Sequence, residues 1–302
     1  MVPLASRPPT PTGLGPLRSV LAGVGDAFVR LAEDLAGEDL DTRIRAIRLH
    51  PNEVGFDPFG FDPAATRYAL AVAALLHRRY FRTKVRGAEN IPDGRVMLVS
   101  NHSGQIPLDG VVIGAAMMLD AEPPRFPRSM VEKWTAELPL ISVFFPRVGQ
   151  VLGSPANARR LLEQGEALLV FPEGSRGISK TFDKRYQLSE FGLGFMRLAL
   201  ETNTPIVPIS VVGAEEQYVS LGNIAPLAKL LGMPAFPIIP QLFFGMLAPL
   251  PTRYHIRFGE PLRFEGDPDD DDAIVGDMVW QVKARVQAMV NDGLASREGI
   301  FR

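Results

Sequence analysis

The 302-residue chain contains no cysteine, and this absence removes several kinds of chemistry at once. Without thiols there is no disulfide framework, no thiolate nucleophile and no thiolate-bound metal, a composition that fits a cytoplasmic protein. Neither sign of charge dominates, since 32 lysines and arginines face 34 aspartates and glutamates. The resulting net charge of −2 identifies no partner, and we expect no nucleic acid among the partners.

Nucleotide-binding motifs are missing as well. Three G-x-G triplets occur, but a large side chain fills the third glycine position of a dinucleotide fingerprint in each (Arg18, Phe28 and Arg197). The chain has no P-loop lysine motif and no G-x-S-x-G nucleophile elbow, which argues against a serine hydrolase acting through Ser103. We therefore expect no metal and no cofactor.

No uninterrupted apolar run is long enough to predict a membrane-spanning helix. The best candidate, Leu230 to Thr252, carries no charge but holds five prolines (Pro234, Pro237, Pro240, Pro249 and Pro251). A proline inside a helix costs about 3 kcal/mol, so this stretch predicts an apolar loop system. Its largest side chains are expected either to enter a membrane surface or to close over the core as a lid (Leu242, Phe243, Phe244, Met246 and Leu247).

Strand-like and helix-like patterns alternate along most of the chain. Strands are expected at 95–100, 126–131, 167–171, 206–211 and 254–258, and helices at 14–35, 64–79, 110–119, 155–164, 189–202 and 271–291. In the first helix, apolar positions such as Val24, Phe28 and Leu31 are interpreted as core. The alternation predicts an α/β protein with a central mixed sheet layered with helices and an N-terminal helical extension.

Composition divides the chain into four segments. Residues 1–12 are proline-rich, do not resemble a signal peptide, and predict a disordered tail. Residues 13–83 predict a helical segment that is a candidate for membrane contact, because a basic cluster ends it; the alternative is a solvated face (Arg78, Arg79, Arg82, Lys84 and Arg86). Residues 84–264 predict the catalytic domain, and residues 265–302 predict an acidic linker and a C-terminal helix.

The most informative turn, Asn101 to Asp109, follows the apolar run Val96 to Ser100. It places His102 and Asp109 at the end of a strand, where the sites of α/β sheets collect. A carboxylate bonded to one ring nitrogen fixes the imidazole tautomer, so that the other nitrogen takes a proton from a hydroxyl. The turn therefore supplies the minimum equipment for alcohol acylation, with His102 as candidate general base. The alternative for Asp109 is a simple cap of the following helix.

A second turn, Phe171 to Gly177, follows the apolar run Ala167 to Val170 and offers amides, a hydroxyl and a guanidinium to an anion (Glu173, Gly174, Ser175 and Arg176). Together with the first turn, with Phe144 to Arg147 and with Val207 to Ile209, this block resembles the glycerolipid acyltransferase family. These are PlsC-like enzymes such as 1-acylglycerol-3-phosphate acyltransferase. The usual family spacing puts the acid five positions after the histidine, at Pro107, so the turn here is two residues longer.

The resemblance implies a glycerol-phosphate acyltransferase-like fold and transfer of an acyl group from acyl-CoA or acyl-ACP to a lysoglycerolipid hydroxyl, in phospholipid synthesis. Lysophosphatidate is the default acceptor. In the family the second block binds the acceptor phosphate, so Arg176 is the expected main contact, Glu173 an orienting group and Arg147 an added positive charge. The enzyme is expected at the cytoplasmic side of a membrane, peripheral or interfacially embedded. A neutral acceptor such as diacylglycerol, or a non-catalytic lipid-binding role, remains an alternative.

Single residues also leave alternatives open. Glu173 is a candidate to pair with Arg176 across their turn, and Arg147 is a candidate surface residue. Glu215 and Glu216 are interpreted as solvated acids, with contact to an acceptor headgroup as the alternative. The other three histidines are expected to have no catalytic role (His50, His77 and His255).

Overall fold

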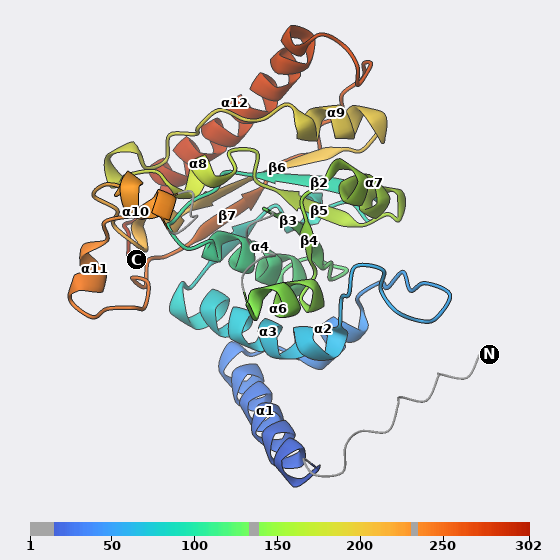
Figure 1. Ribbon diagram of the computed structural model, residues 1–302, viewed down its shortest axis with the longest axis vertical. Helices are drawn as coiled ribbons and strands as arrows, with labels where there is room; N and C mark the ends of the chain where they lie inside the picture. The colour runs from blue at the N-terminus through green and yellow to red at the C-terminus, as the bar shows by residue number, and fades with distance from the viewer. Residues whose placement is uncertain (1–14, 133–138, 231–234) are drawn as a thin grey trace.

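The computed structural model describes residues 15–132, 139–230 and 235–302. The predicted tail at residues 1–12 lies outside the described residues, as does Pro234 of the apolar stretch. The described backbone forms a seven-stranded sheet with helices against both faces (Figure 1). The long first helix protrudes at one end of the molecule, away from the sheet.

The sheet is mixed, as the sequence predicts. Its strands are β1 (Lys84–Arg86), β2 (Val96–Ser100), β3 (Pro127–Val131), β4 (Gln150–Leu152), β5 (Ala167–Val170), β6 (Ile206–Val212) and β7 (His255–Phe258). They lie in the order β1-β7-β6-β2-β5-β3-β4, and all pairs are parallel except β6 with β7. The three strands at the centre, β6, β2 and β5, therefore end at the same edge of the sheet.

The α-helices are α1 (Gly15–Ala36), α2 (Leu40–Arg45), α3 (Pro63–Leu75), α4 (Leu108–Leu119), α6 (Ile141–Arg147), α7 (Pro155–Glu163), α8 (Ser175–Ile178), α9 (Gly194–Glu201), α10 (Ala225–Leu230), α11 (Pro240–Phe243) and α12 (Asp272–Ser296). A π-helical turn, η1 (Leu76–Tyr80), extends α3, and a 3₁₀ turn, η4 (Ala214–Glu216), follows β6. Ser154 caps the start of α7, because its side chain accepts a hydrogen bond from the backbone N–H of Asn157.

Strand β2 shows how the core is divided. All five of its residues are buried, and alternate side chains enter opposite layers. Val96 and Leu98 pack in the apolar cluster that includes residues of α4, whereas Met97 and Val99 pack in the cluster that includes residues of α7, α9 and α12. Strand β2, which leads into the turn of His102, is thus packed between two helical layers.

The N-terminal helices pack on the outside of α4 rather than on the sheet. Val29 of α1 and Leu70 of α3 are buried there with Met118 of α4. The prediction that the other apolar positions of α1 are core is wrong for those that the structure describes. Val24, Phe28, Leu31 and Leu35 are exposed at 63%, 37%, 54% and 42%. Their spacing of four, three and four residues places them on one helix face.

Two predicted features of the elements need correction. The helix expected from Ser189 begins only at Gly194, because the backbone N–H of Ser189 donates to the side chain of Glu173 and that of Gly192 to Pro172 O. Two edge strands, β1 and β4, were not predicted, since three residues are too few to show a period of two.

The basic cluster near residue 80 is largely engaged within the protein, which contradicts its interpretation as a lipid-facing or solvated face. Arg78 donates to Glu38 at 2.5 Å and to Asp120 at 2.7 Å, and Asp120 also lies 2.8 Å from buried His77. The guanidinium of Arg79 donates to Leu35 O, and that of Arg82 donates to Pro251 O. Only Lys84 and Arg86, on the edge strand β1, remain both exposed and without such a contact among the described residues.

The proline-rich stretch forms the predicted loop system, in which α11 spans only Pro240–Phe243. Among the described residues, no helix combines the length and the hydropathy that crossing a bilayer requires. Phe243 and Phe244 are exposed at 79% and 83%, so these side chains do not close over the core as a lid. The base of the loop is anchored by backbone and side-chain contacts of Gln217 and Tyr218.

Candidate active site

The two turns that carry the sequence motifs lie at the ends of neighbouring strands. The turn after β2 contains His102, and the turn after β5 contains Glu173 and continues into α8. Since β2 and β5 are parallel and adjacent, their carboxyl ends bring these turns together, as expected for an α/β sheet. The end of β6, on the other side of β2, adds η4 to the same edge.

His102 and Asp109 are paired, as the sequence predicts. Their Nδ1 and Oδ2 atoms are 2.8 Å apart, and the Asp109 side chain is fully buried. Because an ionised carboxylate only accepts hydrogen bonds, this contact places the ring proton on Nδ1 and leaves a lone pair on Nε2. Oxygens of Asp109 also accept from the backbone N–H groups of Ser103 and Gly110, each at 2.8 Å. The capping role and the pairing role therefore coexist.

The longer turn has room for this pairing because Gly104 adopts a left-handed conformation, with φ of +75°. A side chain at this position would also approach the Nε2 atom of Gln217 to 2.2 Å. Gln217 in turn donates to the backbone oxygen of Ile106 at 2.9 Å. Gly104 and Gln217 together fold the two additional residues back toward the start of α4.

The imidazole is held on two sides by the second turn. The ring of His102 stacks on that of Phe171, with centroids 4.0 Å apart and planes at 23°. A Cβ atom on Gly177 would lie 2.7 Å from the Cβ of His102, so only glycine allows α8 to approach this closely. The side chain of His102 keeps 12% of its surface exposed. Phe171 and Gly177 therefore fix the orientation of the imidazole, while part of its surface stays accessible to a substrate.

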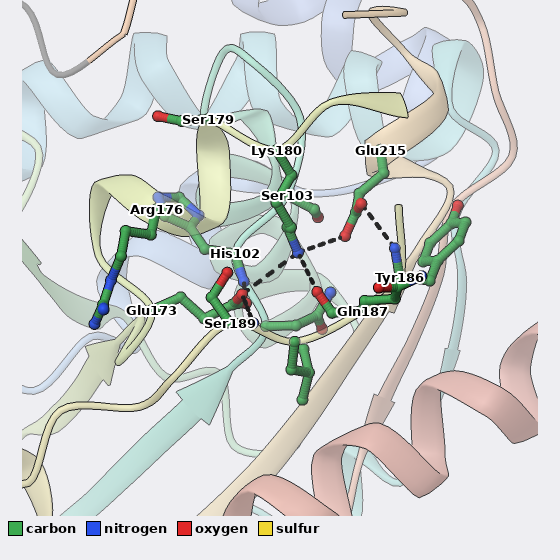
Figure 2. Close-up of polar contacts among 12 residues, drawn as sticks. His102, Ser103, Glu173, Arg176, Ser179, Lys180, Tyr186, Gln187, Ser189 and Glu215 are labelled. Atoms are coloured by element: carbon green, nitrogen blue, oxygen red, sulfur yellow. Dashed lines mark hydrogen bonds and ion pairs between the residues drawn. The ribbon is translucent and has the colours of Figure 1, made fainter. Parts of the chain in front are cut away.

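Glu173 supports His102 rather than facing solvent. Its Oε1 accepts from the backbone N–H of His102 at 2.9 Å, and its Oε2 accepts from that of Ser189 at 2.7 Å. The Glu173 side chain is fully buried and pairs with Lys180 instead of Arg176 (Figure 2). The expected orienting role is thus directed at the histidine backbone, and the alternative of a Glu173–Arg176 pair is wrong.

The remaining predicted anion-binding groups are more peripheral. Arg176 is exposed, points away from the buried polar group in Figure 2, and donates to Glu190 O at 3.3 Å. Gly174 has φ of +57°, and the N–H of Ser175 donates to Glu132 at 3.0 Å. Arg147 ends α6 as an exposed residue whose backbone oxygen accepts from Asp62 and Thr66.

Three residues at the site whose side chains are largely buried were missed or misjudged from the sequence. Lys180 was not singled out, yet its Nζ lies 2.9 Å from Glu215 and 3.4 Å from Glu173. The interpretation of Glu215 and Glu216 as solvated acids is wrong, because they are 7% and 3% exposed. Glu216 forms two hydrogen bonds of 2.6 Å with Arg297, which ties the C-terminal segment to the end of β6.

Ser103 and the other histidines take no part in the pairing. The hydroxyl of Ser103 is buried and has no hydrogen-bond partner among the described residues, so His102 does not activate it. Buried His77 and half-buried Asp120 form a pair at the junction of η1 and α4. His50 lies 3.4 Å from Glu166, and burial lowers the pKa of His255 with help from surrounding cations.

Burial raises the pKa of Glu215 to about 7, against the opposing attraction of Lys180. Since the folded protein binds this proton more tightly than the unfolded chain, stability should fall as the pH rises from about 4.5 to about 7. Between pH 5 and pH 8 the free energy of unfolding should therefore fall less for Glu215→Gln than for the wild type. The difference between the two decreases should be at most about 3 kcal/mol. Thermal unfolding at both pH values tests this, with exposed Glu265→Gln as control. Parallel curves for all three proteins would contradict it.

Comparisons with known proteins agree with this geometry. A model of the acyltransferase family matches residues 82–212, which include both motif turns and β6. An uncharacterized protein from Mycobacterium tuberculosis is 37% identical over 258 residues, covering 83% of this chain and 71% of that protein. A probable 1-acyl-sn-glycerol-3-phosphate acyltransferase from Mycoplasma pneumoniae is 29% identical over 151 residues, 47% of this chain and 54% of the relative.

A similar fold is found in a solved structure. The crystal structure of the 1-acyl-sn-glycerophosphate acyltransferase PlsC from Thermotoga maritima aligns with a TM-score of 0.52 at 18% identity. The alignment covers 94% of this chain and 99% of that chain. The paired histidine and aspartate, the supporting glutamate turn, the matching family model and the shared fold together show that the chain is an acyltransferase of the PlsC-like family.

Proposed function

We propose that the protein transfers an acyl group from acyl-CoA or acyl-ACP to the hydroxyl of a lysoglycerolipid such as 1-acylglycerol 3-phosphate, with His102 as general base. The observation that carries this proposal is the 2.8 Å contact between His102 Nδ1 and Asp109 Oδ2, which leaves Nε2 as a proton acceptor. Similarity to a probable 1-acyl-sn-glycerol-3-phosphate acyltransferase supports the choice of acceptor lipid.

The reaction needs no acyl-enzyme. Nε2 of His102 takes the proton of the acceptor hydroxyl while its oxygen attacks the thioester carbonyl carbon. The tetrahedral intermediate then collapses, the carbon–sulfur bond breaks, and the imidazolium returns the proton to the thiolate leaving group. Asp109 stabilises the imidazolium in between, because its carboxylate lies against the other ring nitrogen.

His102→Ala should lower acyl transfer by roughly 10²- to 10⁴-fold, since the general base is lost. Asp109→Asn should have a smaller but clear effect, because an amide cannot accept from His102, Ser103 and Gly110 together. The measurement is release of free thiol from acyl-CoA with and without lysophosphatidate, with His50→Ala as a matched control. Thiol release that does not depend on the acceptor would indicate a thioesterase, and full activity in His102→Ala would refute the mechanism.

We further propose that Arg176 contacts the acceptor phosphate. Its guanidinium is exposed, and it belongs to the same short turn whose Gly177 packs against His102. The planar guanidinium binds phosphate oxygens in pairs, which suits an acceptor that carries the phosphate.

Arg176→Ala should raise the Michaelis constant for lysophosphatidate by roughly 10- to 100-fold and that for acyl-CoA by much less, because a hydrogen bond to a charged group contributes about 1.5–3 kcal/mol. Steady-state kinetics with lysophosphatidate and with diacylglycerol tests the assignment, and Arg185→Ala, another exposed arginine, is the control. If diacylglycerol is the better acceptor and the substitution weakens both acceptors equally, Arg176 is not the phosphate site.

We also propose that the protein binds a membrane surface from the cytoplasmic side. The apolar loop around α11 is exposed, and its base is connected to the catalytic turn by hydrogen bonds. The backbone oxygen of Gln217 accepts from Leu250 N–H, and the side chain of Gln217 donates to Ile106 O in the catalytic turn. The hydroxyl of Tyr218 donates to Leu247 O. The exposed face of α1 offers a second apolar surface. A lipid acceptor entering through this loop would arrive beside His102.

Phe243→Ser with Phe244→Ser should lower co-sedimentation with phosphatidylglycerol-containing vesicles, because burying each phenyl ring in lipid contributes at least about 1.5 kcal/mol. Phe28→Ser with Leu31→Ser tests α1 separately. Trp280→Ser, which removes an exposed ring from α12, is the control and should leave binding unchanged. Salt should have only a small effect, since the guanidinium groups of Arg78, Arg79 and Arg82 bond acceptors of the protein and only Lys84 and Arg86 of the basic cluster remain available. Wild-type protein that stays in the supernatant at every salt concentration would reject the proposal.

A further inference from the structure

We propose that Lys180 is a positioning residue that joins the turn of His102 to the ends of β5 and β6 and so holds the catalytic imidazole in place. The proposal rests on the function proposed for His102. Lys180 follows α8 and is almost fully buried, with 8% of its side chain exposed. It lies between two carboxylates from different segments, as Figure 2 shows.

Lys180 reaches the turn of His102 by two routes. Through its side chain it lies 3.4 Å from Glu173 Oε2, and the other oxygen of Glu173 accepts from the backbone N–H of His102. Through its backbone it accepts a 2.9 Å hydrogen bond from Nε2 of Gln105, three residues after His102. Both routes end within the same short turn, on opposite sides of its left-handed residue Gly104.

The ammonium group has a second anchor at the end of β6. It donates to Glu215 Oε1 at 2.9 Å and to Gln187 O at 3.3 Å. The other oxygen of Glu215 accepts from the backbone N–H of Tyr186 at 2.8 Å. The chain of contacts therefore runs from the end of β2 through Glu173 and Lys180 to the end of β6.

The burial of these groups explains why this position needs a cation. Glu173 and Glu215 have almost no exposed side-chain surface, and the ammonium of Lys180 lies against both. Removing the ammonium would leave Glu173, the acceptor for the N–H of His102, without its cationic partner and would let its carboxylate shift. A small displacement of a reacting group is enough to lower the rate by about 100-fold.

The direct test is the amide resonance of His102 in protein labelled with ¹⁵N-histidine, which contains four histidines. His102→Ala assigns the signal. Lys180→Met should shift the His102 amide proton and leave those of His50, His77 and His255 in place. Lys184→Met, which removes an exposed lysine nearby, should shift none of them.

Kinetics supplies the second readout. Lys180→Met should lower kcat by roughly 10- to 100-fold and change both Michaelis constants by less than about 2-fold, because substrate-binding groups are untouched. Adding Glu215→Gln should cause no further loss, since both changes break the same link. If Lys180→Met does not fold, Lys180→Gln takes its place, since it keeps hydrogen-bond donors without the charge.

The two readouts separate this proposal from the proposed function. A shifted His102 amide supports the link even if the acceptor or the donor has been misidentified. An unshifted His102 amide in a folded Lys180 variant would overturn the proposal. A variant whose Michaelis constants rise while kcat stays unchanged would also overturn it.

Discussion

The buried carboxylate of Asp109 is the group on which the geometry of the site depends. It has no exposed surface, and its oxygens accept from the imidazole of His102 and from two backbone N–H groups. Burying a carboxylate is costly unless such donors surround it, so the turn and the first residues of α4 must keep their arrangement. The same contacts select the histidine tautomer that is able to act as a base.

The other groups that hold His102 in place come from the ends of three parallel strands. β2 carries the turn of His102, β5 carries Phe171 and Glu173, and β6 leads into Glu215. Each end contributes a different kind of restraint: ring stacking at 4.0 Å, a hydrogen bond to the histidine backbone, and the buried contact with Lys180. The imidazole is thereby held by packing, by its backbone and by its Nδ1 atom, while Nε2 is left for chemistry.

The sequence predicts the parts of this arrangement that are local. The apolar runs before His102 and Glu173 indicate strands, and strand ends are where sites collect, so the meeting of the two turns was predictable. The Asp109 pairing was also predictable despite the longer turn, because Gly104 allows the chain to fold back. The exposure of Phe243 and Phe244 decides a question that the sequence left open between a lid and a free surface.

Contacts between distant segments could not be predicted in the same way. Lys180 and Glu215 are 35 positions apart, and nothing in either neighbourhood marks them as a buried pair. The sequence left Arg78 as a lipid-facing or solvated cation, because its actual partners, Glu38 and Asp120, lie about forty positions away on either side. Periodicity in α1 indicated an apolar face correctly, but whether such a face is covered depends on which elements pack nearby.

The most direct test of the central claim is a crystal structure of the protein with lysophosphatidate and a non-transferable thioether analogue of acyl-CoA. The account predicts that the acceptor hydroxyl lies within roughly 2.6–3.2 Å of His102 Nε2 and faces the sulfur-bound carbon that takes the place of the thioester carbonyl carbon. An acceptor hydroxyl bound away from the imidazole, with both substrates in place, would contradict it.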